Sequence, residues 1–452
     1  MRLTFLGAAE TVTGSKFLLE DERWKLLVDY GLFQGDPDLR ERNWRTPAFH
    51  PRALNAVLLT HAHIDHSGGI PRLVRDGFQG AIYCSEATAD LCGILLPDSG
   101  RIQEDDAELA NRYGYSRHAP ALPLYTEADA RACLPQFHPV GYGTPRALSD
   151  EISFTLSRAG HILGSSFVQL RIGDGTTIVF TGDIGRPNSP IMKPPAQLQD
   201  ADHLVLECTY GDRKHGPEYP REQIGAVIRR TAARGGTTVI PAFAVGRTQD
   251  LLYHLHSLKQ TGDIPEIPIF LDSPMAIDAT ELLLRHINEH QLAPQECANI
   301  CGIARYARRA DESKAINASP MPKVIVSASG MATGGRVLHH LKHYVGDTRN
   351  TVLLAGYQAP GTRGDRLVRG ETSLKIHGRD WPVRAEIMQL DNMSAHADYS
   401  EILDWLKNFR APPRKVFLVH GEPAAARAMQ QHIIESLGWT CIIPRHGQSV
   451  DL

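Results

Sequence analysis

A short segment of the chain, THAHIDHSGG at residues 60–69, carries four side chains that bind metal ions well. It follows a run of apolar residues, and an apolar run closed by polar and Gly residues predicts a buried strand that ends in a loop. His61 and His63 alternate, so in an extended backbone both project from one face and can bind one ion. Asp65 and His66 turn toward a second ion, where a carboxylate oxygen beside an imidazole suits Zn²⁺. The pattern predicts a metal site, because a His-rich surface loop would not need the carboxylate.

Four further candidates each come directly after a predicted strand. Asp29 stands at such a strand end, although Asp before a turn is frequently only a turn residue. His161 has a glycine on either side, which suits a loop whose backbone approaches another group closely. Asp183 follows its strand through Thr-Gly, and a carboxylate can bridge two cations where an imidazole cannot. His420 has the same relation to its strand, so we expect all of these side chains at one site.

The composition is that of an ordinary soluble protein. The chain has 452 residues, of which 42% are hydrophobic and 22% charged, with a formal net charge of −3. Its length predicts two to three domains, and its charge balance means that nucleic-acid binding would need a local basic surface. The seven cysteines are an odd number without a metal-binding spacing, which argues against a disulfide framework. Neither a signal peptide nor an apolar run of membrane-spanning length is visible, so we expect a cytoplasmic protein without a membrane partner.

The order of predicted strands and helices suggests one domain interrupted by another. Between about 212 and 390, strands and helices alternate regularly, which is the pattern of a parallel α/β domain. The strand-end metal candidates lie on both sides of this block, at 1–211 and 391–452. We therefore predict a metal-bearing domain in two parts around an inserted second domain. A helix is predicted from Glu86 to Leu96, followed by an irregular covering segment to Pro145.

With these motifs the chain resembles the metallo-β-lactamase superfamily and, within it, the β-CASP nucleases, over almost its full length. The superfamily motifs match Asp29, the HxHxDH segment, His161 in AGHILGS and Asp183 in FTGD. The β-CASP motifs match Glu207 in LECTYGD, His396 in MSAHAD and His420 in LVHGE. SAHAD is similar to the polyadenylation-factor branch of the group rather than to RNase J. The resemblance implies an α/β fold, an αββα metallo-β-lactamase sandwich with an inserted parallel α/β β-CASP domain.

The resemblance also implies a function: a zinc-dependent ribonuclease that cuts single-stranded RNA, as an endonuclease, with a hydroxide shared by two zinc ions per chain. Asp183 would bridge the ions. The other ligands would be His61, His63 and His161 at one ion, and Asp65, His66 and His420 at the other. Asp29 would orient a ligand by accepting its N–H, and Asp65 would also serve catalysis. His396, held by Glu207, would give a proton to the leaving oxygen; the alternative is that His396 only neighbours the cap of the helix beginning at Tyr399.

The expected RNA contacts lie in the inserted domain. The loop at residues 327–335, SASGMATGG, follows a strand and precedes a helix, so its N–H groups and hydroxyls can cradle a phosphate. With the arginines on neighbouring loops, the expected substrate-binding residues are Arg247, Ser327, Ser329, Gly330, Met331, Arg336 and Arg363. Asp365 stands where relatives often carry Arg, which puts one phosphate contact in doubt.

Two other functions fit parts of the pattern. A hydrolase of small thioesters or lactams would need the metal site but not the inserted domain. A catalytically silent RNA-binding subunit would not need all seven ligand positions, and all are filled here. A homodimer is a further expectation that the sequence alone leaves open.

Overall fold

The structure is a computed structural model that describes residues 1–114, 116, 118–216, 219–320, 322–359 and 361–452. The chain divides into two compact units. Unit 1 comprises Met1–Lys214 and His396–Leu452, and unit 2 comprises His215–Ala395. The sequence predicts this interruption at 212–390.

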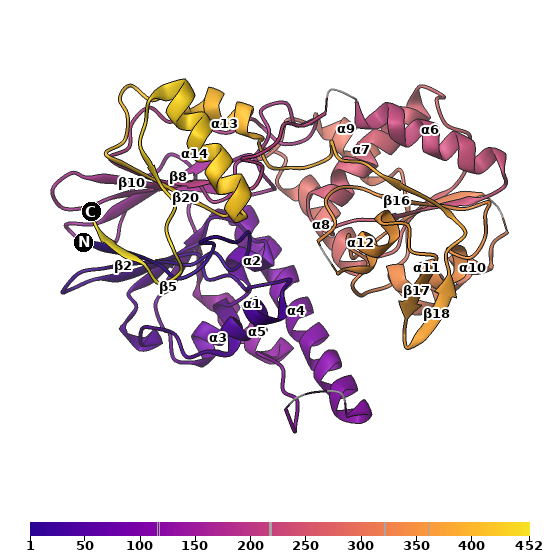
Figure 1. The fold of residues 1–452 in the computed structure, drawn as a ribbon, viewed down its shortest axis with the longest axis horizontal. Helices are drawn as coiled ribbons and strands as arrows, with labels where there is room; N and C mark the ends of the chain where they lie inside the picture. Colours follow the sequence, from indigo (N-terminus) through magenta and orange to yellow (C-terminus); the bar gives the residue numbers. More distant parts are fainter. Residues whose placement is uncertain (115, 117, 217–218, 321, 360) are drawn as a thin grey trace. The chain divides into compact units, whose positions relative to one another are not determined.

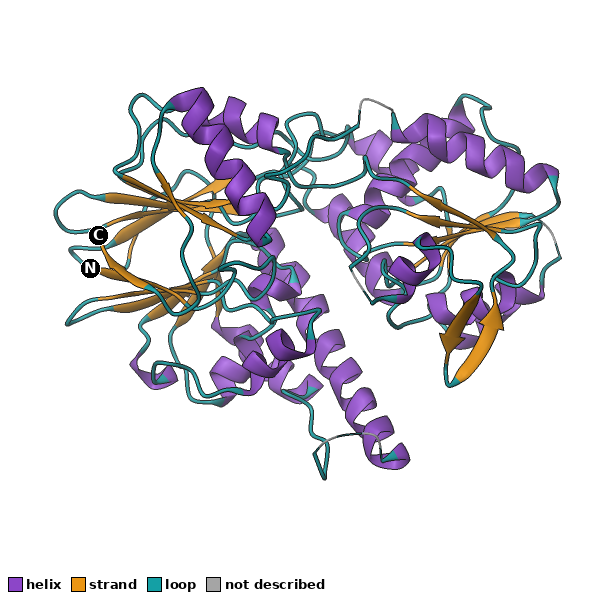
Figure 2. Cartoon of the chain, in the orientation of Figure 1, coloured by secondary structure: helices purple, strands orange, loops and turns teal. Residues whose placement is uncertain are grey.

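Unit 1 contains two seven-stranded sheets (Figures 1 and 2). The first has the order β22-β1-β2-β3-β4-β5-β6, with bounds Ser449–Asp451, Arg2–Phe5, Phe17–Glu20, Lys25–Val28, Ala56–Leu58, Ala81–Cys84 and Phe137–Pro139. The second has the order β21-β20-β11-β10-β9-β8-β7, with bounds Cys441–Ile442, Lys415–Val419, His203–Glu207, Thr177–Phe180, Ser166–Arg171, Ser153–Arg158 and Arg146–Ala147. β1 pairs with β22 in antiparallel fashion, so the two chain ends lie side by side (Figure 1).

The two sheets of unit 1 pack face to face. Alternate side chains of the strands point into one shared core, as the period of two in a strand requires. Phe5 of the first sheet and Phe417 of the second are both buried, with ring centroids 5.1 Å apart. Leu156 and Phe180 of the second sheet belong to the same core. Burial of these apolar side chains between the sheets is the main stabilisation of unit 1.

Helices cover the outer faces of both sheets (Figure 1). On the second sheet, Ile402 and Trp405 of α13 and Met429 of α14 are buried in a core with Leu204 and Leu206 of β11. The α-helices of unit 1 are α1 Pro37–Glu41, α2 Ile64–Ser67, α3 Ile70–Arg75, α4 Glu86–Tyr113, α5 Glu127–Cys133, α13 Tyr399–Leu406 and α14 Pro423–Leu437, with 3-10 turns at η1 Arg42–Trp44, η2 Pro51–Ala53 and η3 Leu134–Gln136. This arrangement confirms the predicted αββα sandwich.

The prediction for the segment after Leu96 was wrong. Helix α4 does not end there but continues through Pro97 to Tyr113, where Gly114 in the left-handed region caps it. Proline lacks the N–H that would bond to the carbonyl of Gly93, yet the helix tolerates this one missing bond. Beyond Pro97 the helix buries few residues, so no apolar stripe marks it in the sequence.

Unit 2 is built on a six-stranded sheet of order β14-β13-β15-β12-β16-β19, in which every pairing is parallel. The strand bounds are Arg305–Tyr306, Ile269–Leu271, Lys323–Ser327, Thr237–Pro241, Thr351–Leu354 and Glu386–Gln389, and a separate hairpin pairs β17 Ser373–Ile376 with β18 Arg379–Pro382. The helices are α6 Pro220–Ala233, α7 Arg247–Gln260, α8 Pro274–Arg285, α9 Pro294–Cys301, α10 Ala310–Ala318, α11 Val337–Tyr344 and α12 Arg363–Val368.

Helices lie on both faces of this sheet, with α6 and α7 on one side and α10 and α11 on the other (Figures 1 and 2). Both faces of a parallel sheet must be covered, which explains why the middle residues of its central strands are apolar. β12 and β15 are buried along their whole length. The predicted parallel α/β architecture is confirmed for unit 2. Within the described residues, no helix combines the length and the apolar character that crossing a membrane requires.

Candidate metal centre

The candidate ligands of unit 1 come from loops at the C-terminal ends of strands. His61 and His63 follow β4, and the short helix α2 carries Asp65 and His66. The remaining three follow strands of the second sheet: His161 after β8, Asp183 after β10 and His420 after β20. Since β10, β11 and β20 run parallel, and β3 and β4 do too, their carboxyl ends supply loops at shared sheet edges.

Unusual backbone conformations bring these loops together. Gly182 has φ +51°, and a Cβ atom there would lie 2.7 Å from the Cβ of Thr60, so only glycine lets the Asp183 loop approach the metal-binding loop. Asp29 and His420 also have positive φ, at 58° and 52°, although neither is glycine. Such conformations are held only where the surrounding contacts fix them, and they cluster at functional sites.

Three imidazoles and one carboxylate oxygen form a first group of facing atoms. His63 Nδ1 lies 3.1 Å from His61 Nε2 and 3.3 Å from His161 Nε2. The Oδ2 of Asp183 lies 3.3 Å from His61 Nε2 and 3.4 Å from His161 Nε2. The four ligand atoms therefore surround one point.

A second group faces the other oxygen of the same carboxylate. His66 Nε2 lies 3.2 Å from His420 Nε2 and 3.2 Å from Asp183 Oδ1. Asp65 Oδ2 lies 3.4 Å from His420 Nε2. Asp183 is thus the only side chain of the seven that presents one oxygen to each group, and its Oδ1 is buried without a hydrogen-bond partner in the described part of the chain.

These separations fit tetrahedral zinc. Zinc–nitrogen bonds of about 2.0–2.1 Å place neighbouring tetrahedral ligand atoms about 3.3–3.4 Å apart. The measured separations in the two groups are 3.1 to 3.4 Å. Direct hydrogen bonding would not explain the whole set, because several imidazole nitrogens face one another. All four ligand atoms of the first group lie within 4.8 Å of one another, as do those of Asp65, His66 and His420.

The protonation of the first group also suits metal binding. Burial lowers the pKa of His63 to about 3 and holds the pKa values of His61 and His161 below the usual range, so these imidazoles keep a lone pair. Burial opposes the ionisation of Asp183, but the neighbouring imidazoles, with His420 and His66 foremost, hold its pKa well below the usual range. Neutral imidazoles around an ionised carboxylate are what a divalent cation requires.

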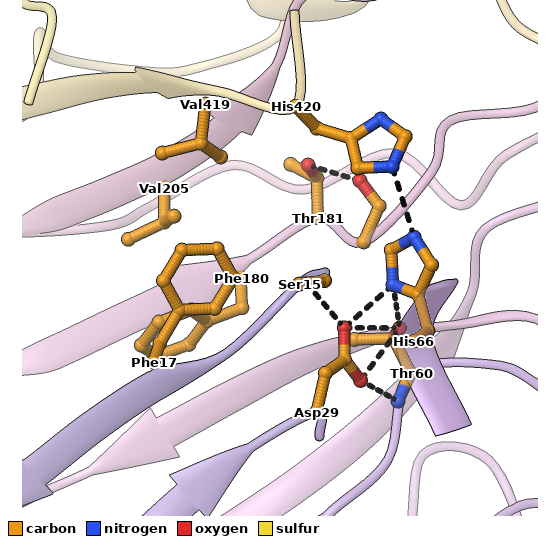
Figure 3. Close-up of a pocket in the computed structure, with 11 residues that line it drawn as sticks. Ser15, Phe17, Asp29, Thr60, His66, Phe180, Thr181, Val205, Val419 and His420 are labelled. Atoms are coloured by element: carbon orange, nitrogen blue, oxygen red, sulfur yellow. Dashed lines mark hydrogen bonds and ion pairs between the residues drawn. The ribbon is translucent and has the colours of Figure 1, made fainter. Parts of the chain in front are cut away.

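His66 behaves differently because two carboxylates face it. Burial alone would lower its pKa, but Asp183 and Asp29 raise it well above the usual value. Its Nδ1 lies 2.7 Å from Asp29 Oδ2, and Figure 3 shows the two side chains in contact. The carboxylates that favour a proton on His66 Nε2 favour a metal ion in the same place, since each supplies negative charge.

Asp29 is fully buried and accepts hydrogen bonds on both oxygens (Figure 3). Ser15 Oγ donates to Oδ2 at 2.9 Å, and the Thr60 N–H donates to Oδ1 at 2.8 Å. With Asp29 fixed in this way, its contact to His66 Nδ1 holds the imidazole with Nε2 toward the second group. The structure thus places Asp29 behind the candidate ligands, in contact with His66.

Sequence reasoning missed three hydroxyl residues that orient this site. Ser15 and Thr60 hold Asp29, and Thr209 holds His420. Thr209 Oγ1 donates to the His420 carbonyl at 2.9 Å and lies 3.0 Å from Nδ1, a contact that directs Nε2 toward the second group. Thr60 lies in THAHIDHSGG, Thr209 in LECTYGD and Ser15 in GAAETVTGS. Their places in or near the metal-binding motifs are the sequence signal that could have identified them.

His396 lies beside the first group and contacts a buried carboxylate. Its Nδ1 lies 3.1 Å from Glu207 Oε1, and its Nε2 lies 3.9 Å from Asp183 Oδ2. Burial alone would lower the pKa of His396, but Glu207 and Asp183 raise it to about 9. The side chain is 19% exposed, while those of Glu207 and Asp183 are at most 2% exposed.

The helix that begins at Tyr399 has its own capping residues beside His396. Asp398 is the N-cap of α13, where its side chain accepts from Ser400 and Glu401 N–H groups. Glu401 completes a capping box with the N–H of Asp398. The helix is therefore capped without the imidazole of His396, which faces Glu207 instead.

Three family models match successive parts of the chain. The model described as the metallo-beta-lactamase superfamily matches residues 12–208, that of the Beta-Casp domain matches 248–367, and that of the Zn-dependent metallo-hydrolase RNA specificity domain matches 380–444. The chain is 36% identical to Ribonuclease TTHA0252 of Thermus thermophilus over 459 residues, with 100% of both chains covered. The chain belongs to the metallo-β-lactamase superfamily and its β-CASP group. It is a metal-dependent hydrolase.

Other similarities agree with this membership. The β-CASP chain is 31% identical to transcription termination factor FttA of Thermococcus kodakarensis, with 100% of this chain and 71% of that protein covered. A crystal structure of a protein of unknown function from Enterococcus faecalis superimposes with a TM-score of 0.55 at 13% identity, covering 100% of this chain and 99% of that chain. At such identity the likeness concerns the fold alone.

The expected RNA-contact residues of this β-CASP chain all lie in unit 2, at the C-terminal ends of its parallel strands. Arg247 begins α7, and its Nη1 donates to the carbonyl of Ala355 at the end of β16. The Gly364 N–H donates to the Met331 carbonyl at 3.1 Å, and Arg363 Nη1 donates to the Thr333 carbonyl at 3.0 Å. The loop that carries Ser329, Gly330 and Met331 therefore contacts the segment of Arg363.

Two of the expected RNA contacts face the interior of unit 2 instead. Ser327 is fully buried, and its Oγ donates to the Asp272 carbonyl at 2.7 Å. Arg336 donates to Asp272 Oδ1 at 2.7 Å and to the carbonyl oxygens of Ala307 and Arg308 at 2.9 and 2.6 Å. These bonds engage the Ser327 hydroxyl and three of the five Arg336 N–H donors, so we assign both side chains a structural role and do not retain them as RNA contacts.

Asp365 also has local partners. It is the third residue of α12, and its Oδ2 accepts from the Gly361 N–H at 2.8 Å. Arg369, one turn later, donates to Oδ1 at 2.8 Å. A carboxylate in the first turn of a helix is stabilised by the helix dipole. Asp365 therefore stabilises the start of α12 at the position where a phosphate contact was in doubt.

Proposed function

We propose that this chain is a zinc-dependent ribonuclease that hydrolyses phosphodiester bonds of single-stranded RNA as an endonuclease, with two zinc ions per chain. The observation that carries the proposal is the position of Asp183, which directs Oδ2 to one group of imidazoles and Oδ1 to a second group. A single tetrahedral site uses four ligands, and seven are gathered here.

The ligand assignment follows from the two groups of facing atoms. His61, His63 and His161 would hold one ion, and Asp65, His66 and His420 the other, with Asp183 shared. When bound, such ions lower the pKa of water toward neutrality and stabilise the negative charge that develops on an attacked phosphate. Asp29 and Thr209 orient His66 and His420 by the hydrogen bonds to their Nδ1 atoms.

His396 is proposed as the general acid. The contact with Glu207 keeps its imidazole protonated near neutral pH, and its Nε2 is directed toward Asp183. A leaving ribose oxygen needs a proton, and a histidine held by a carboxylate is a suitable donor. Glu207 also accepts from the Ile184 N–H at 2.7 Å, which fixes the carboxylate that in turn orients His396.

RNA is proposed as the substrate on the strength of the family. One relative that is similar over the whole chain is named a ribonuclease, and the model that matches residues 380–444 is described as an RNA specificity domain. Arg247, Ser329, Gly330, Met331 and Arg363 are retained as proposed RNA contacts in unit 2. A hydrolase of small thioesters or lactams would have no use for them.

The decisive experiment combines metal analysis with cleavage of one single-stranded RNA labelled at either end. We expect about two zinc ions per chain and internal cuts, which release a labelled fragment of intermediate length from each end. The matched control is His396→Ala, which should keep its zinc but cut slowly. Release of mononucleotides only, from one end, would contradict the endonuclease mode, and absence of any cutting by the zinc-loaded protein would contradict the ribonuclease proposal.

A further inference from the structure

Unit 1 contains a buried lysine without a polar partner. Lys16 is 9% exposed, and neither a hydrogen bond nor an ion pair reaches its ammonium group from the described residues. The Nζ atom instead lies over two aromatic rings, 4.3 Å from the centroid of Phe33 and 5.2 Å from that of Tyr30. Cation–π contacts of this kind offset only part of the cost of removing an ammonium ion from water.

The charged groups nearest to Lys16 are themselves basic. The guanidinium of Arg42 lies over the same Phe33 ring, 5.5 Å from its centroid, and the His446 ring lies 6.1 Å from it. Burial, followed by Arg72 and Arg42, lowers the pKa of Lys16 to about 7. We call Lys16, Arg42 and His446 the Phe33 cluster.

Carboxylates do not neutralise the Phe33 cluster. Arg72 pairs with Asp76 at 3.2 Å, and Arg75 approaches the same carboxylate at 3.6 Å. The other donors of Arg72 bond to backbone carbonyls between residues 43 and 45. In the described part of the chain, neither Arg42 nor His446 has an ion-pair partner. Gathering like charges in a partly buried place costs free energy, so a purely structural cluster would be better served by an apolar residue at position 16.

The segments that form the cluster also hold the metal centre. Ser15, next to Lys16, donates its hydroxyl to Asp29 and its N–H to the Asp65 carbonyl at 2.8 Å. Tyr30, next to Asp29, donates its N–H to the His66 carbonyl at 2.8 Å. An anion at the Phe33 cluster would therefore be fixed relative to the metal ligands by two short backbone segments.

We propose that the Phe33 cluster binds a phosphate of the RNA strand other than the one that is cleaved. The proposal rests on the proposed ribonuclease function. Arg42 supplies a permanent charge, Lys16 adds a second one where its ammonium group is protonated, and His446 supplies an exposed N–H donor at the rim. Trp44, two residues after Arg42 in the same 3-10 turn, is 53% exposed and offers an aromatic ring on which a base can stack. That aromatic favours a nucleic acid over a free phosphate ion or an acidic peptide.

The test is the salt dependence of RNA affinity. Zinc-loaded protein carrying His396→Ala, which slows cutting, is titrated with an end-labelled single-stranded RNA of about 20 nucleotides at several salt concentrations. Adding Lys16→Gln and Arg42→Gln together should lower the slope of log affinity against log salt by about 0.7, the worth of one phosphate on a single strand. The matched control is Arg171→Gln, which removes one exposed charge from β9 of unit 1 and should leave the slope unchanged.

Several outcomes would overturn the proposal. One is an unchanged slope in the double variant with its zinc content intact, and another is an equal loss of slope in the Arg171→Gln control. If Lys16→Gln does not fold, Lys16→Met replaces it, since methionine fills an apolar site without a charge. Preferential binding of polyglutamate over RNA, lost in the double variant, would assign the cluster to an acidic peptide. Failure of the unvaried chain to cut RNA would contradict the proposed function, whereas cutting with an unchanged slope contradicts only this inference.

Discussion

Replacement of Lys16 by methionine should stabilise the protein, and by an amount that depends on pH. The pKa of Lys16 falls from 10.5 to about 7 in the folded chain, chiefly through burial. At about 1.4 kcal/mol per pH unit, this difference in pKa means that the charged form of Lys16 destabilises the fold by at most on the order of 5 kcal/mol. The sign follows from proton binding. Between pH 7 and 10.5 the unfolded chain keeps a proton that the folded chain has lost, so the stability of the unvaried protein rises with pH across this window. Below pH 7 both states hold the proton, and the cost is fully present.

The assay is urea unfolding of the full chain and of Lys16→Met at about pH 6, 7.5 and 9, on either side of the lowered pKa, in zinc-containing buffer without phosphate. We expect the variant to be more stable at the lowest pH, with an advantage that shrinks as the pH rises. Lys407→Met is the matched control, because Lys407 is exposed and pairs with Asp404 at the surface, so the stability difference should stay small and independent of pH. An advantage of Lys16→Met that is constant with pH, or that grows toward alkaline pH, would refute the reasoning.

Three further predictions concern the metal centre and unit 2. Asp183→Asn should reduce the zinc content below two per chain and abolish hydrolysis, as measured by elemental analysis and RNA cleavage; full activity with one ion would contradict the shared carboxylate. His396→Ala should keep its zinc yet lose roughly 10²- to 10⁴-fold in rate, the usual worth of a positioned general acid; loss of an ion would instead identify His396 as a ligand. Asp272→Ala should destabilise the protein by about 3–5 kcal/mol in urea unfolding, because it leaves Arg336 and His340 without their buried carboxylate; a loss below about 1 kcal/mol would contradict that role.

The candidate ligands could be predicted because their residue types and their places in the chain point the same way. A histidine or aspartate directly after an apolar run is both a suitable ligand and a residue at a sheet edge. Sequence could not predict which candidate ligands face each other, because His66 and His420 lie 354 residues apart in the chain and yet approach to 3.2 Å. Only the sandwich, with both chain ends in one sheet, brings these segments together.

The sequence could not predict which way the charged side chains of unit 2 point. Arg336 follows Gly334 and Gly335, which suggested a phosphate-binding turn at the start of a helix. Its actual partner, Asp272, lies 64 residues earlier and is itself fully buried. A local motif shows that an arginine stands near the start of a helix. Whether its side chain points to solvent or to a buried carboxylate depends on Asp272, which follows a strand elsewhere in the chain.

His340 shows the same limit from the opposite side. No carboxylate lies in register with it on its own helix, so the sequence alone suggests only a surface or packing histidine. In the folded chain its Nε2 lies 2.8 Å from Asp272 Oδ2, and its Nδ1 lies 2.8 Å from Asn317 Oδ1. Asp272 therefore connects β13 to α11 through His340 and Arg336, beneath the loop at residues 328–335. If that loop binds phosphate, the buried network sets where it does so, although none of its members needs to touch the RNA. The sequence motif therefore identifies the loop as a candidate for phosphate binding, whereas the buried charges that hold the shape of the loop come from Asp272, Arg336 and His340 behind it.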